Sequence, residues 1–99
     1  MNSELLAMLE YIEQEREIDK VTLFNLVEDA LTLSAQKELG DAVLNPKVLI
    51  NRVNGDLVTW ADFEVVEEVG DRRQEINLED AKGFKLDAEI GDIVSAEYT

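Results

Sequence analysis

Apolar side chains in the first third of the sequence recur at helical spacing and predict two helices. Ser3 is a favourable N-cap for a helix over about residues 3–17. The apolar positions of this helix lie on one arc of the helical wheel: Leu5, Leu6, Met8, Leu9 and Ile12. Asp19 and Gly40 are start and stop signals for a second helix over about residues 20–39.

The second helix has an unusually wide apolar face. Its apolar positions are Leu23, Phe24, Leu26, Val27, Ala30, Leu31, Leu33 and Ala35. They cover about 200° of the wheel, whereas a surface helix usually shows a stripe of little more than 100°. We therefore expect this helix to be covered on two sides, by the first helix on one flank and by a sheet on the other.

The pattern becomes β-like after Pro46. Two β-rich runs over about residues 47–60 flank Asn54-Gly55, a strong hairpin signal. The later elements are a strand at about 63–69 that is either separate or the continuation of a bent one, a short helix at about 78–82 capped by Asn77, and a strand at about 92–98. This order predicts an α+β fold in one domain over residues 1–99: two N-terminal helices packed on a small, mainly antiparallel sheet, with one short extra helix.

The register of the hairpin is open to two alternatives. A three-residue loop ending at Gly55 pairs Ile50 with Val58 and Val48 with Trp60, which gathers four large apolar side chains on one face. A two-residue loop moves each partner one residue further along the second strand. We favour the three-residue loop because of the apolar face that it creates.

The charge of the chain narrows its possible partners. Its 99 residues include 9 Lys and Arg against 23 Asp and Glu, a formal net charge of −14. Such a field repels phosphate, so we expect no direct binding to DNA, RNA or an anionic membrane. Basic protein surfaces, apolar grooves and cations are the compatible partners. The sequence has neither a signal-peptide pattern nor an apolar run of about 20 residues, and we expect a cytoplasmic protein.

Catalytic chemistry has few candidate residues in this sequence. The chain has no Cys and no His, which excludes disulfides, thiol catalysis and imidazole-based triads. Its serines therefore have no imidazole base. Adjacent carboxylates such as Glu67 and Glu68 point to opposite faces of a strand, which does not suit acid–base catalysis. We expect no catalytic site, no metal site and no cofactor.

Interaction with another protein is the function that remains. Met8 and Tyr11 lie at one edge of the apolar arc of the first helix, where they either pack on the second helix or face a partner. We interpret Trp60, in the hairpin, as a core residue rather than an interface residue. From the residues alone, the chain is a small acidic α+β interaction domain.

Several strings in the sequence resemble the N-terminal domain of the NusA family. At the start these are Leu5-Leu6 to Leu9-Glu10, Asp19-Lys20 and Val27-Glu28-Asp29-Ala30-Leu31. Later they are Val48-x-Ile50-Asn51-Arg52-x-Asn54-Gly55-Asp56, Glu64 to Val69, Glu75 to Lys82 and Gly91-Asp92. Each string is short, but their order and spacing over the whole chain make the resemblance specific.

The resemblance implies a role without catalysis in transcription elongation, pausing, termination and antitermination. Domains of this family dock on bacterial RNA polymerase beside the RNA exit channel, on the flap-tip helix of the β subunit. The family continues into a helical part and then S1 and KH modules, from which RNA binding is expected, whereas this chain stops at Thr99.

The end of the second helix departs from the family pattern. Family members often carry a basic cluster there, and this chain keeps only Lys37 beside an acid. We name Met8, Tyr11 and Lys37 as candidate partner-binding residues and expect a monomer that does not bind RNA directly. The alternative function is a stand-alone acidic protein that mimics nucleic acid and inhibits a basic partner.

Overall fold

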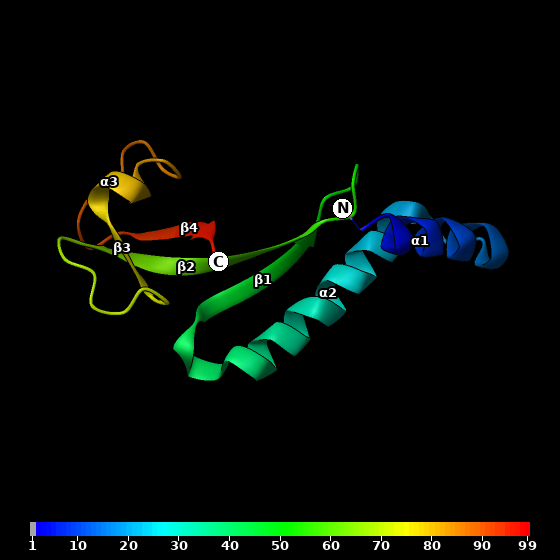
Figure 1. The fold of residues 1–99 in the computed structure, drawn as a ribbon, viewed down its shortest axis with the longest axis horizontal. Coiled ribbons are helices and arrows are strands. Elements are labelled where there is room, and N and C mark those ends of the chain that lie inside the picture. Colours follow the sequence, from blue (N-terminus) through cyan, green and yellow to red (C-terminus); the bar gives the residue numbers. More distant parts are fainter. Residues whose placement is uncertain (1) are drawn as a thin grey trace.

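The computed structural model describes residues 2–99 and shows an elongated α+β domain (Figure 1). Its elements are α1 (Ser3–Arg16), α2 (Lys20–Leu39), a 3-10 turn η1 (Gly40–Ala42), β1 (Leu44–Ile50), β2 (Leu57–Val66), β3 (Glu75–Asn77), α3 (Leu78–Ala81) and β4 (Ile93–Glu97). β2 is the central strand and pairs antiparallel with β1 and with β4. β3 pairs parallel with the end of β2. The predicted α+β class is confirmed, with a mixed sheet of four strands.

Side-chain caps set the start of each helix. Asn2, and not Ser3, caps α1, because its Oδ1 accepts a hydrogen bond from the backbone N–H of Leu5 at 3.1 Å. The expected Ser3 cap is therefore wrong by one residue. The carboxylate of Asp19 caps α2 by accepting from the N–H of Thr22 at 3.2 Å, as its position in the sequence indicates.

The β1–β2 hairpin differs from both predicted registers. Val48 lies opposite Thr59 and Ile50 opposite Leu57, so the strands are joined by a longer loop than expected. Asn51 closes this loop, since its N–H donates to the carbonyl of Asp56 at 2.8 Å and its own carbonyl accepts from the N–H of Gly55.

The side chain of Asn51 explains the longer loop. Its Oδ1 accepts from the N–H groups of Val53 at 2.8 Å and Asn54 at 3.1 Å, which folds the chain into a local turn before β2 begins. The carbonyl of Asn54 then accepts from the N–H of Asn2 at 3.0 Å. The loop thus also holds the beginning of α1.

β2 is a single strand from Leu57 to Val66, without a break before Phe63. Of the two alternatives for the predicted strand at about 63–69, the one that makes it a continuation of the preceding strand is correct, although the strand ends at Val66. Ala61, Phe63 and Val65 are all buried, so one face of β2 keeps a continuous alternation through Asp62. β3 was not predicted, because three residues are too few to show an alternating pattern.

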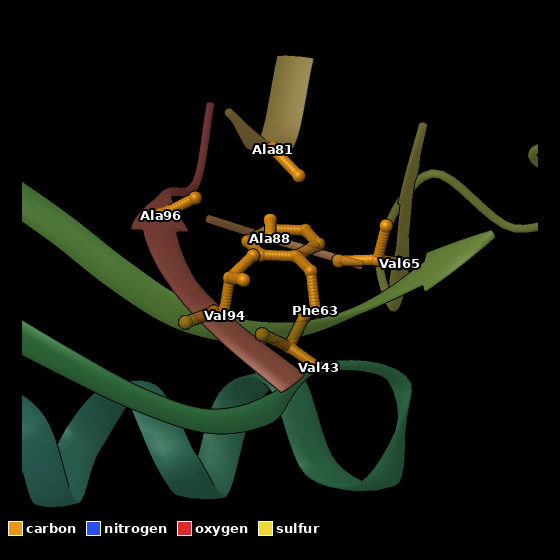
Figure 2. Close-up of a cluster of buried hydrophobic side chains, with 8 residues drawn as sticks. Val43, Phe63, Val65, Ala81, Ala88, Val94 and Ala96 are labelled. Carbon is orange, nitrogen blue, oxygen red and sulfur yellow. The ribbon is translucent and has the colours of Figure 1, made fainter. Parts of the chain in front are cut away.

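Two separate apolar cores lie at the two ends of the domain. The core at the sheet end consists of Val43, Ala61, Phe63, Val65, Ala81, Ala88, Val94 and Ala96 (Figure 2). The core at the helical end consists of Leu9, Leu23, Phe24 and Ile50. α2 runs alongside β1 and joins the two ends (Figure 1). Leu26 and Leu33 of α2 remain exposed, so the expectation that its whole apolar arc is covered is wrong.

Side chains of α2 occupy the outer edge of β1. The hydroxyl of Thr32 accepts from the N–H of Val48 at 2.9 Å, and the carboxylate of Glu28 accepts from the N–H of Ile50 at 2.8 Å. Glu28 and Thr32 are four residues apart, about 6 Å along a helix, and Val48 and Ile50 are two residues apart, about 6.6 Å along a strand. The spacing of the two acceptors on α2 therefore matches the spacing of the two donors on β1. β1 therefore has no free N–H at these two positions.

Candidate protein-interaction surfaces

Met8 and Tyr11 both face solvent on α1. Their exposed fractions are 58% for Met8 and 64% for Tyr11, whereas Leu9 between them is buried against α2. Of the two orientations left open by the sequence, the one facing outward is therefore observed. Exposed side chains of this size are available for contact with another protein.

Lys37 lies at the end of an exposed stripe on α2. Leu26 and Leu33 are 57% and 60% exposed, and their spacing places them on the same side of the helix as Lys37. Phe24 packs against α1, and Lys37 lies thirteen residues beyond it, about 20 Å along the helix axis. The structure therefore does not bring Lys37 together with Met8 and Tyr11.

A groove of about 760 Å³ opens at the sheet end of the domain. Its apolar lining comes from six strands, loops or terminal segments: Phe63, Val69, Ile76, Phe84, Ala96 and Tyr98. Val69 and Phe84 are exposed at 36% and 47%. Trp60 is half-buried, and its ring meets the ring of Phe84 edge-on at a centroid distance of 6.0 Å. Our interpretation of Trp60 as a core residue is thus only partly correct.

Charged side chains surround this groove. Arg73 forms an ion pair with Asp71, with Nε and Oδ1 at 3.1 Å, and this contact lowers the pKa of Asp71 and raises the pKa of Arg73. The carboxylate of Glu75 accepts from the N–H groups of Gly70 at 2.7 Å and Asp71 at 2.9 Å. Arg72 forms no ion pair with any group of residues 2–99. The groove therefore combines an apolar lining with one available cation.

Sequence reasoning missed this groove. Its lining residues are spread from Phe63 to Thr99, and no local spacing relates them. The exposed apolar residues Val69 and Phe84, both next to glycines, are the only hint that we find in the sequence.

Over residues 2–99, no group of three or more Asp, Glu, His or Cys side chains converges in a way that could hold a metal ion. None of the helices in this described part of the chain is long and apolar enough to cross a membrane.

The structure thus defines a small acidic α+β domain with exposed apolar surfaces on its helices and in a groove of its sheet end. The sequence model of the NusA N-terminal domain matches residues 4–98. The chain belongs to the NusA N-terminal domain family, and the resemblance found in the sequence is confirmed.

Curated relatives match the whole chain or most of it. The chain is 40% identical over 99 residues to the transcription termination/antitermination protein NusA of Halalkalibacterium halodurans and 38% identical to that of Bacillus subtilis. Both matches cover 100% of this chain and 26% of the relative, so the chain spans about a quarter of their length. The NusA of Rickettsia prowazekii is 34% identical over 91 residues, 92% of this chain and 18% of that protein.

A solved structure has the same fold. The solution structure of the N-terminal domain of NusA from B. subtilis matches with a TM-score of 0.66 and 36% identity. The match covers 100% of this chain and 79% of that chain. The chain therefore has the fold of this NusA N-terminal domain.

Proposed function

We propose that this chain docks on bacterial RNA polymerase beside the RNA exit channel, on the flap-tip helix of the β subunit. In this role it serves transcription elongation, pausing, termination and antitermination. The observation that carries the proposal is the match of residues 4–98 to a family whose relatives are named transcription termination/antitermination proteins. The domain acts as a monomer in the cytoplasm, without catalysis, a cofactor or direct RNA contact.

The groove at the sheet end supports this proposal physically. An amphipathic helix binds by placing apolar side chains of one face into an apolar groove. Val69 and Phe84 line a groove of about 760 Å³ and are exposed to such a partner. We assign the flap-tip helix to this groove and keep Met8 and Tyr11 as a second contact with the polymerase.

The net charge of −14 supports docking on a basic protein surface rather than on RNA. Lys37 is the only cation of the last turn of α2, too little charge for a phosphate-binding cluster. RNA binding is assigned to the S1 and KH modules of the family. A domain that binds one conformation of the polymerase more tightly than another shifts the enzyme toward the conformation it prefers, which changes pausing without a catalytic group.

Titration of the fluorescently labelled chain with core RNA polymerase and with a flap-tip peptide tests the proposal. Val69→Asp in the groove should weaken binding of both partners about tenfold or more, because a carboxylate replaces an apolar contact. Tyr11→Asp should weaken binding of the polymerase but not of the peptide. Val53→Asp is the matched control, since Val53 is 88% exposed and lies outside both surfaces.

Two outcomes would contradict the proposal. Failure of the chain to bind either the polymerase or the peptide would exclude docking by this domain. Displacement of the chain from a basic partner by DNA or RNA, with a steep dependence on salt, would instead support the acidic mimic of nucleic acid.

A further inference from the structure

The two outer strands of the sheet have different edges. At the outer edge of β1, Thr32 and Glu28 of α2 accept from the N–H groups of Val48 and Ile50. β4 contacts the rest of the sheet through β2 alone. One edge of the sheet is thus occupied by a helix, and the other is open.

The hydrogen-bond pattern shows which groups of β4 are free. The N–H of Tyr98 donates to Thr59, and the carbonyl of Asp92 accepts from Val65, both at 2.8 Å. Bonded residues alternate in an antiparallel ladder, so the even-numbered residues of β4 bond to β2 and the odd-numbered ones point outward. Within residues 2–99, nothing hydrogen-bonds to the outward N–H groups of Ile93, Ser95 and Glu97.

The side chains around this edge are acidic on one face of the sheet. Ile93, Ser95 and Glu97 are exposed and lie opposite Glu64, Asp62 and Trp60 of β2, in that order. Glu64, Asp62 and Glu97 form no ion pair with any group of residues 2–99. Three carboxylates therefore lie beside the open edge, on one face of two neighbouring strands.

The other face of β4 is apolar. Val94 and Ala96 are 3% and 1% exposed and belong to the core of the sheet end. A strand added to β4 would alternate in the same way, with one set of side chains beside Val94 and Ala96 and the other beside the carboxylates. Its matching sequence has apolar residues alternating with Lys or Arg.

We propose that β4 is a docking edge for an extended peptide segment in which basic and apolar residues alternate, bound by strand addition. This interaction goes beyond the proposed docking on the polymerase. Ile93 and Ser95 lie outside the groove, whereas Ala96 and Glu97 line it, so the docking edge adjoins the groove at the end of β4. Backbone hydrogen bonds to three outward residues provide the affinity, and the alternation of side chains provides the specificity. A second copy of this chain is the less suitable occupant, because two domains of charge −14 repel each other.

Binding of a synthetic peptide tests the proposal. The probe is acetyl-Lys-Val-Lys-Val-Lys-Val-Lys-amide, and the control peptide carries Glu at each Lys position. Calorimetric titration of the 99-residue chain should show binding of the basic peptide, weakened by salt, and none of the acidic one. Amide hydrogen exchange of Ile93, Ser95 and Glu97 should slow on binding, since these N–H groups become donors.

Ser95→Pro separates strand addition from simple charge attraction. Proline removes the outward N–H of residue 95 but none of the bonds between β4 and β2, and edge strands tolerate it. This variant should bind the basic peptide about tenfold more weakly or worse, whereas Ser95→Thr should bind as the parent chain does. Glu97→Gln should weaken binding about threefold and reduce its dependence on salt.

The outcomes that overturn the proposal are distinct. Unchanged binding by Ser95→Pro, or unchanged exchange of the three amides in the parent chain, would show that the peptide does not pair with β4. The exchange measurement uses the parent chain and decides the question even if the proline variant fails to fold. A dimer in sedimentation that dissociates in Ser95→Pro would assign the edge to a second copy. Loss of polymerase docking in Val69→Asp has no bearing on these results.

Discussion

The two ends of this domain are stabilised in different ways. At the sheet end, small side chains such as Ala61, Ala81 and Ala96 pack around Phe63 in an apolar core. At the helical end, the apolar core is smaller and polar side chains add to it. There the carboxylate of Glu28 accepts from the N–H of Ile50 and from Arg52 Nη2 at 2.9 Å, and the guanidinium of Arg52 lies 4.3 Å from the centroid of the Phe24 ring.

This difference predicts that the two ends respond to different substitutions. A closely packed core of small residues cannot fill the space left by a large side chain, so loss of volume is costly there. A hydrogen-bonded junction depends instead on single polar groups, because a buried donor without a partner is destabilising. The sheet end should therefore be sensitive to truncation and the helical end to loss of a carboxylate.

Phe63→Ala should have the largest effect on stability. Phe63 is 5% exposed and lies at the centre of the sheet-end core (Figure 2). Its truncation should lower the free energy of unfolding in urea by about 3–5 kcal/mol. Phe84→Ala, which removes a half-exposed ring at the groove, should cost only about 1 kcal/mol. Equal losses in the two variants would contradict a core centred on Phe63.

Glu28→Ala should have the next largest effect, at the helical end. The substitution leaves the N–H of Ile50 without an acceptor and Arg52 without its ion pair, and should cost about 2–3 kcal/mol. Asp29→Ala is the matched control, because Asp29 follows Glu28 in the sequence and is exposed, and it should change stability by less than about 0.5 kcal/mol. Hydrogen exchange of the Ile50 amide should accelerate in Glu28→Ala, and an unchanged rate would show that α2 does not protect this edge.

The parts of the fold that were predictable from the sequence are those with local signals. The apolar periodicity and the Asp19 cap indicate α2, and the side chain of Asn77 caps α3 as its position suggests. The predicted hairpin register was wrong because the observed register depends on the side chain of Asn51, which precedes the Asn54-Gly55 turn signal. Asn51 bonds back to the loop and lengthens it, and nothing in the Asn54-Gly55 pair reveals this.

The candidate surfaces were predictable only where one helix carries them. Met8 and Tyr11 could be identified on α1 because both lie on a single helical wheel. The groove and the open edge of β4 could not be identified from the sequence, because each depends on the pairing of strands that are distant in sequence. The residues of such sites are brought together by the order of the strands in the sheet, and no local spacing in the sequence relates them.

Gly55→Ala should have a smaller effect, which arises from the junction between the loop and α1. Gly55 has φ of +79°, and an added Cβ would lie 2.3 Å from the carbonyl oxygen of Asn2. The matched control is Gly91→Ala, since Gly91 has φ of +94° but nothing within 4 Å of its Cβ position. Strain in φ alone should cost about 1 kcal/mol in the control, and the contact with Asn2 should raise the cost to about 2 kcal/mol in Gly55→Ala. Equal urea midpoints for the two variants would show that the loop does not hold α1.

Arg73→Gln should have the smallest effect, visible mainly as a change with pH. Hydrogen bonds from Arg73 lower the pKa of Asp71 in the folded domain, so this carboxylate contributes stability above its unfolded pKa of about 4. The contribution is lost as the pH falls through the lowered folded pKa. In Arg73→Gln, the pKa of Asp71 measured by carbon-13 NMR titration should rise toward the ordinary value, and the free energy of unfolding should fall less steeply below pH of about 4.

Arg72→Gln is the control and should leave the titration of Asp71 unchanged, because the hydrogen bonds to the Asp71 carboxylate come from Arg73. Both groups of the pair are exposed, so solvent screens their attraction and the effect remains far below that of Phe63 or Glu28.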